Sequence, residues 1–148
     1  MTNFAPEFQE YRTVRRWMED GQDLYRLLLA QETAADTYTR LAHQFQGREG
    51  VMLHRLAREA RAHGACLEGI CVLVTGKVPN LHTLPPETGT TQSLLRRCYG
   101  RAMRLLVTYE ARREDLEYGP IFARLAVQQQ EHCKTILELI GHAAAASC

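Results

Sequence analysis

Apolar residues recur every three or four positions along most of the chain, and two-residue alternation of apolar and polar positions is nearly absent. This period is typical of amphipathic α-helices. Glycine, proline and threonine divide the pattern into segments. We therefore predict an all-α protein with a short N-terminal helix over about 7–19, a break at Gly21, and four long helices over about 22–46, 49–75, 92–117 and 120–141.

Several residues at the ends of these segments have the chemistry of helix boundaries. Gly76 is suited to closing the second long helix, because glycine readily adopts the left-handed conformation of a C-cap. Thr90 or Thr91 offers a capping hydroxyl to the third long helix. Pro120 suits the first turn of the fourth, which we expect to end at Gly141.

A long connection separates the second and third long helices. Residues 77–90 contain three of the five prolines and cannot continue a helix. Two helix pairs, each with a short internal turn and joined by this longer link, predict an antiparallel four-helix bundle with a crossover connection. A length of 148 residues fits one domain over the whole chain.

The two predicted helix pairs repeat one design. RLLLAQE (26–32) and RLLVTYE (104–110) each end in a glutamate, and LAREARAH (56–63) and LAVQQQEH (125–132) each end in a histidine. Counting in steps of three and four places these end residues on apolar stripes. A buried carboxylate is disfavoured unless it is paired, neutralised or bound to metal. We therefore predict that four side chains converge in the core: Glu32, His63, Glu110 and His132.

Two interpretations of these four side chains stay open on the residues alone. Two glutamates and two histidines in a bundle core are typical of a carboxylate-rich transition-metal site, for which iron, zinc and manganese are all possible. Alternatively, each glutamate pairs with a protonated histidine in a structural network that holds no metal.

The sequence resembles a rubrerythrin-like diiron domain of the ferritin-like superfamily, without a rubredoxin module. The likeness rests on QETAADTYTRLA, LAREARAH and EYGPIFARLAVQQQEHC and on the Glu110 segment, and it covers about 22–141. It implies a ferritin-like bundle, a homodimer, and a redox activity towards peroxide or oxygen, as in a peroxidase or other oxidoreductase. It also implies that the metal ligands are Glu32, His63, Glu110 and His132.

The chain departs from this family at both Glu-x-x-His motifs. Ala60 stands three residues before His63, and Gln129 stands three residues before His132. Two divalent ions would repel each other strongly with only two carboxylates to offset their charge. We therefore expect an altered site, with which a single metal ion is compatible. Three nearby side chains could replace the missing ligands: Glu59, Gln129 and Cys66.

Composition restricts the partners and the cellular location. A balance of 18 basic and 17 acidic side chains predicts no nucleic-acid surface. No segment has the pattern of a signal peptide or a membrane span, so we expect a cytoplasmic protein. Five cysteines without a CxxC pair disfavour a disulfide framework and a zinc ribbon.

A second function is compatible with the same pattern. The chain could be a metal-free ferritin-like bundle that acts as a structural or partner-binding dimer. Its exposed apolar helix surface, including Trp17 and Met18, would then supply the contact.

Overall fold

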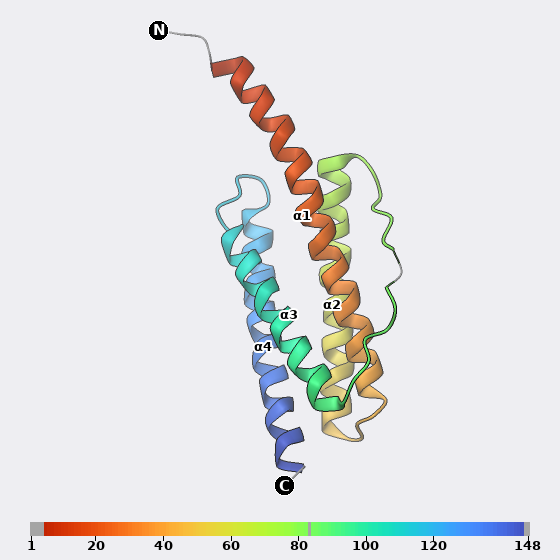
Figure 1. The fold of residues 1–148 in the computed structure, drawn as a ribbon. Helices are drawn as coiled ribbons and strands as arrows, with labels where there is room; N and C mark the ends of the chain where they lie inside the picture. Colours follow the sequence, from red (N-terminus) through yellow and green to blue (C-terminus); the bar gives the residue numbers. More distant parts are fainter. Residues whose placement is uncertain (1–4, 83, 147–148) are drawn as a thin grey trace.

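The computed structural model describes residues 5–82 and 84–146, with side chains from Gly21 onward. These residues form no strand, which confirms the predicted all-α class. The chain consists of α1 (Ala5–Ala42), α2 (Arg48–Thr75), α3 (Thr91–Ala111) and α4 (Gly119–Ala146). Figure 1 shows these helices side by side in two pairs, α1 with α2 and α3 with α4, as expected of a helical bundle.

The second pair lies against the first through two further contacts. α1 lies next to α3, and α2 lies next to α4. Across the described residues, no helix has both the length and the apolar character that a membrane crossing requires. The side chains of Trp17 and Met18 lie outside the described ones.

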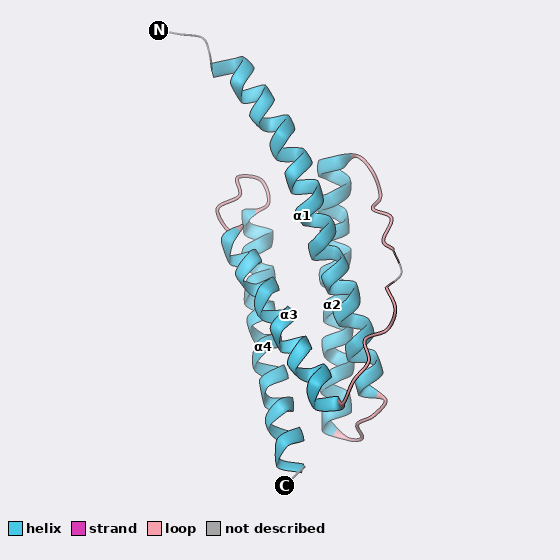
Figure 2. Cartoon of the chain, in the orientation of Figure 1, coloured by secondary structure: helices cyan, strands magenta, loops and turns pink. Residues whose placement is uncertain are grey.

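The long connection runs along the outside of the bundle, from the end of α2 to the start of α3 (Figure 2). It contains no helix in the described stretches 77–82 and 84–90, as predicted. Glu87 ties it to the helices, because its Oε1 atom accepts hydrogen bonds from Thr37 Oγ1 at 2.7 Å and from Arg101 Nη2 at 2.6 Å.

The predicted boundaries of this connection are confirmed. Gly76 adopts a left-handed conformation with φ 74°, and its N–H donates to the Val72 carbonyl at 2.8 Å. Thr90 caps α3, since its hydroxyl accepts a hydrogen bond from the Ser93 N–H at 3.1 Å. Both ends of the connection are therefore fixed by local chemistry that the sequence displays.

The predicted break at Gly21 is wrong. α1 continues through this residue as one helix, so there is no separate short N-terminal helix. Gly21 lies where α1 passes the end of α2, and a Cβ atom there would be 3.0 Å from Thr75 Cγ2. The glycine serves a close approach between two helices, which a helix can accommodate without ending.

α3 ends at Ala111, before the predicted 117. Asp115 explains the difference, because its Oδ1 atom accepts hydrogen bonds from the backbone N–H groups of Glu117 at 3.0 Å and Tyr118 at 2.9 Å. Such side-chain hydrogen bonds stabilise a turn in competition with the helix. The turn leads directly into α4, which has Pro120 in its first turn as predicted.

Two other helix ends differ from the prediction. α1 ends at Ala42 rather than near 46. α4 continues through Gly141 to Ala146, because Gly141 keeps a negative φ and the alanines that follow have the highest helix propensity.

The core has two apolar clusters, one on each side of a polar layer. On α1 the apolar positions are interrupted at Gln31, and on α2 they are interrupted at His63. On α4 the interruption covers Gln129 and His132. The two helix pairs therefore meet at mid-height through polar side chains rather than through a continuous apolar core.

Candidate functional site

Two histidines form the centre of this polar layer. His63 on α2 and His132 on α4 are both buried, with 4% and 2% of their surfaces exposed. Their rings stack with the centroids 5.1 Å apart and the planes 24° from parallel. The predicted positions of both histidines in the core are confirmed.

A glutamine from α1 joins this centre to the other helices. The Gln31 Nε2 atom donates to Tyr109 Oη at 2.8 Å and lies 3.3 Å from Gln129 Oε1 and 3.5 Å from His63 Nδ1. Gln129 Nε2 in turn donates to the Ala102 carbonyl at 3.4 Å. All four helices thus contribute to one buried hydrogen-bond network.

The outer nitrogen of each histidine contacts an oxygen from the opposite helix. His63 Nε2 lies 2.6 Å from Gln128 Oε1 on α4, and His132 Nε2 lies 3.1 Å from Glu59 Oε2 on α2. Glu59 and His63 are four residues apart on α2, as are Gln128 and His132 on α4. On each helix, the residue four positions before the histidine therefore contacts the histidine of the other helix.

These contacts define the hydrogen positions on His63. The Gln128 oxygen accepts only, so Nε2 carries the proton and donates. The inner nitrogen, Nδ1, then accepts from the Gln31 amide. A neutral ring satisfies both contacts.

Burial lowers the pKa of both histidines below the ordinary value of 6.5. For His63, the neighbouring His132 lowers the pKa further, while Gln128 and Glu59 act in the opposite direction. For His132, the hydrogen bond that the ring donates to Glu59 opposes the effect of burial. Both rings are therefore neutral at pH 7, and the contact between His132 and Glu59 is a hydrogen bond to a carboxylate rather than an ion pair.

The rest of the buried layer is also uncharged. Burial raises the pKa of the Tyr109 hydroxyl, which keeps it protonated, and Gln31 and Gln129 are amides. The carboxylate in contact with the His132 ring is that of Glu59, and 43% of its side chain is exposed. The layer thus avoids the cost of burying a charge.

The prediction that Glu32 and Glu110 face the core is wrong. Both side chains are exposed. Glu110 pairs with Arg113 at 3.1 Å on the surface. Glu32 lies against α2, where a Cβ atom added to Gly64 would be 2.9 Å from its Oε1 atom. The structure brings His63 and His132 together and leaves the two glutamates outside.

The residue before each glutamate occupies the buried position instead. Gln31 and Tyr109 each precede a predicted ligand by one residue, which is a rotation of about 100° around the helix. Both residues lie at the level of the polar layer, since Gln31 reaches both His63 and Tyr109. The sequence pattern on α1 indicates that Gln31 is the buried residue, because it continues the stripe of Leu24 and Leu28 towards Ala35 and Tyr38.

Among the described residues, no three His, Cys, Asp or Glu side chains are arranged to hold a metal ion as they stand. Cys66 is half-buried, and burial raises the pKa of its thiol, which disfavours a thiolate ligand. No family model, curated protein or solved structure matches this chain. The chemistry of its own side chains is therefore the guide to its function.

Proposed function

We propose that this chain is a metal-binding helical bundle related to rubrerythrin-like proteins, in which one transition-metal ion binds between α2 and α4. The ligands are His63 and His132 through their outer nitrogens and Glu59 through its carboxylate. The observation that carries this proposal is the stacked pair of neutral imidazoles, each with its Nε2 atom directed to an oxygen from the opposite helix.

The donor set suits a divalent transition metal. Histidine binds metal as the neutral ring, and the lowered pKa of both histidines favours that form. Glu59 supplies a negative charge and is exposed enough to change its conformation without disturbing the core. Two imidazoles and one carboxylate are compatible with iron, and also with zinc or manganese.

The ligand set predicted from the sequence fits a metal less well. Glu32 and Glu110 are exposed and lie outside the buried layer, so the proposal replaces both with Glu59. Binding at the outer nitrogens requires a proton shift from Nε2 to Nδ1 on each ring. For His63, rotation of the Gln31 amide would place its oxygen against the new Nδ1–H, as the outer shell of metal-bound histidines usually provides.

A bound iron ion would leave coordination positions open to water, oxygen or peroxide. Such a site is compatible with the redox role that the resemblance implies. The chain's own contribution is to hold two neutral rings in place through Gln31 and Gln128 and to offer the carboxylate of Glu59.

Elemental analysis tests this proposal. Protein purified without a chelating tag, and again after anaerobic incubation with ferrous iron, should contain one metal ion per chain. Glu59→Gln and His63→Gln should each reduce the metal content. Glu32→Gln and Glu110→Gln are matched controls and should leave it unchanged.

Three results would overturn the proposal. Absence of metal under both conditions would exclude the site, and two ions per chain would indicate a dinuclear centre. Loss of metal in Glu32→Gln or Glu110→Gln, with full retention in Glu59→Gln, would restore the ligand set predicted from the sequence.

A second function is favoured by a different observation. Both nitrogens of His63 have protein partners, so the network is complete around this ring without a metal ion. A metal-free bundle that acts as a structural or partner-binding dimer would use this layer to fix the register of the helices. Under this alternative, His63→Gln would lower the unfolding temperature, and the wild-type protein would bind no metal.

A further inference from the structure

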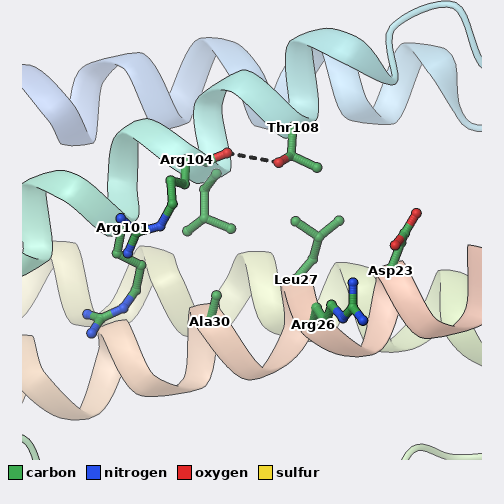
Figure 3. A pocket seen from close by; sticks show the side chains of 8 residues that line it. Asp23, Arg26, Leu27, Ala30, Arg101, Arg104 and Thr108 are labelled. Atoms are coloured by element: carbon green, nitrogen blue, oxygen red, sulfur yellow. Dashed lines mark hydrogen bonds between the residues drawn. The ribbon is translucent and has the colours of Figure 1, made fainter.

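A pocket of about 400 Å³ lies between α1 and α3, where the two helix pairs meet. This face is distinct from the contact between α2 and α4 that carries the histidine pair. Figure 3 shows that α1 and α3 line opposite walls of the pocket. Its lining residues are Asp23, Arg26, Leu27, Ala30, Arg101, Arg104, Leu105 and Thr108.

The floor of the pocket is apolar. Leu27 and Leu105 are buried with 6% and 4% of their surfaces exposed, and Ala30 lies beside them on α1. The volume is within the range of about 300–1,000 Å³ that is usual for small-molecule sites. An apolar ligand portion would therefore find both space and an apolar surface.

The rim is cationic. Three arginines and one aspartate line the pocket, and this aspartate, Asp23, is already within 3.4 Å of Arg112 Nη2. Within the part of the chain whose side chains are described, no carboxylate forms an ion pair with Arg26 or Arg104. The rim therefore holds the positive charges of Arg26 and Arg104, with which no described carboxylate forms an ion pair.

Two arginines mark one end of the pocket. In Figure 3, Arg101 and Arg104 point to the same end, away from Asp23. The Arg104 guanidinium folds back along α3, so that a Cβ atom at Gly100 would lie 3.4 Å from its Nη1 atom. Arg101 binds Glu87 through Nη2, and its buried Nη1 atom lacks a hydrogen-bond partner among the described residues.

We propose that this pocket binds a small organic carboxylate with an aliphatic chain. The chain packs on Leu27, Ala30 and Leu105, and the carboxylate lies against the guanidinium group of Arg104, at the end of the pocket to which Arg101 also points. Guanidinium groups match the planar geometry of a carboxylate and bind it through paired hydrogen bonds. Burial of the aliphatic chain adds affinity in proportion to the apolar area removed from water.

Isothermal titration of the full chain with octanoate tests this proposal. Octanoate should bind more tightly than acetate, because only octanoate has a chain long enough to cover the apolar floor. Arg104→Gln should weaken octanoate binding by about tenfold, the effect expected of a hydrogen bond between charged groups. Arg26→Gln, at the opposite end of the pocket, should weaken it less. Arg96→Gln, an exposed position on α3 outside the pocket, is the matched control and should have no effect.

A pocket-filling substitution gives an independent test. Ala30→Leu places a larger side chain on the floor and should abolish octanoate binding while the helix content and the unfolding temperature are retained. Inorganic phosphate should compete poorly, because it cannot use the floor.

The proposal is overturned if octanoate does not bind the wild-type protein, or if acetate or phosphate binds as tightly. It is also overturned if Arg96→Gln weakens binding as much as Arg104→Gln. The comparison of octanoate with acetate uses the unaltered protein, so it stays decisive even if a variant fails to fold.

Discussion

The rings of His63 and His132 stack across the contact between α2 and α4, 5.1 Å apart between centroids. Because each ring belongs to a different helix pair, this stack joins the two halves of the bundle. Both rings are buried and neutral, so protonation of either ring would place a charge inside the folded protein and destabilise it.

We expect the free energy of unfolding to decrease as the pH falls below about 6.5, the ordinary pKa of histidine. Burial lowers the folded-state pKa of His63 and His132, so the unfolded chain takes up protons that the folded chain does not. This stabilisation is fully present above the ordinary pKa and is lost as the pH falls towards the lowered folded values. Each unit of pKa difference corresponds to about 1.4 kcal/mol.

Urea unfolding at a series of pH values measures this dependence. His132→Gln should flatten the decrease, because it removes one of the two groups. His82→Gln, which alters an exposed histidine in the connection, should leave it unchanged. Equal pH dependence in wild type and His132→Gln would contradict the assignment.

The Glu59 carboxylate should hold the pKa of His132 up against the effect of burial. Glu59→Gln removes the hydrogen bond to a charged group that favours the protonated ring, so the pKa of His132 should fall further. Nuclear magnetic resonance titration of the histidine ring protons measures this change. Glu131→Gln, which alters an exposed acid adjacent to His132 in sequence, should shift the pKa less; an equal shift would exclude a specific role for Glu59.

Gln129 occupies a buried position that tolerates an amide but not a charge. Gln129→Glu places a carboxylate against the Gln31 amide and the Ala102 carbonyl, and neither of these partners carries a charge to neutralise it. We expect a loss of about 3 kcal/mol in the free energy of unfolding at neutral pH. The loss should shrink in acid, where the new carboxyl is protonated.

Gln130→Glu is the matched control for this change. Gln130 is exposed on the adjacent position of α4, and its substitution should alter the free energy of unfolding by no more than about 0.5 kcal/mol. Chemical denaturation of both variants measures the difference. A similar loss of unfolding free energy in the two variants would show that the buried layer tolerates a charged side chain.

The ion pair between Glu87 and Arg101 should stabilise the long connection. Both side chains are largely buried, and Glu87 also accepts a hydrogen bond from Thr37. Glu87→Gln should lower the free energy of unfolding by about 2 kcal/mol and increase proteolysis within residues 84–90. Asp36→Asn removes an exposed ion pair with Arg40 and should have an effect below about 1 kcal/mol; equal effects would refute a special role for Glu87.

Much of the fold could be predicted from the sequence, because helix ends depend on local chemistry. Gly76 and Thr90 act as caps through contacts within one turn, and proline excludes helix from the connection. The role of Gly21 could not be predicted in this way, because it depends on Thr75, a residue on another helix. Asp115 was missed because a turn formed by one side chain leaves little trace in the apolar pattern.

Half of the candidate site could be predicted in the same way. His63 and His132 stand in clear apolar stripes, and both are buried. On α1 and α3 the apolar stripes are broad. Either of two residues that are adjacent in sequence could therefore be assigned to the buried face. The charge that a metal ion requires favours Glu32 and Glu110 as ligands, whereas burial without a counter-charge favours the neutral Gln31 and Tyr109.

The pairing of α1 with α2 and of α3 with α4 also governs how the chain folds. Most contacts between helices join elements that follow each other directly in sequence, and such local contacts form rapidly. The stack of His63 on His132 joins residues far apart in sequence, so it forms only when one hairpin docks on the other. We expect substitutions in this layer to accelerate unfolding more than they slow folding.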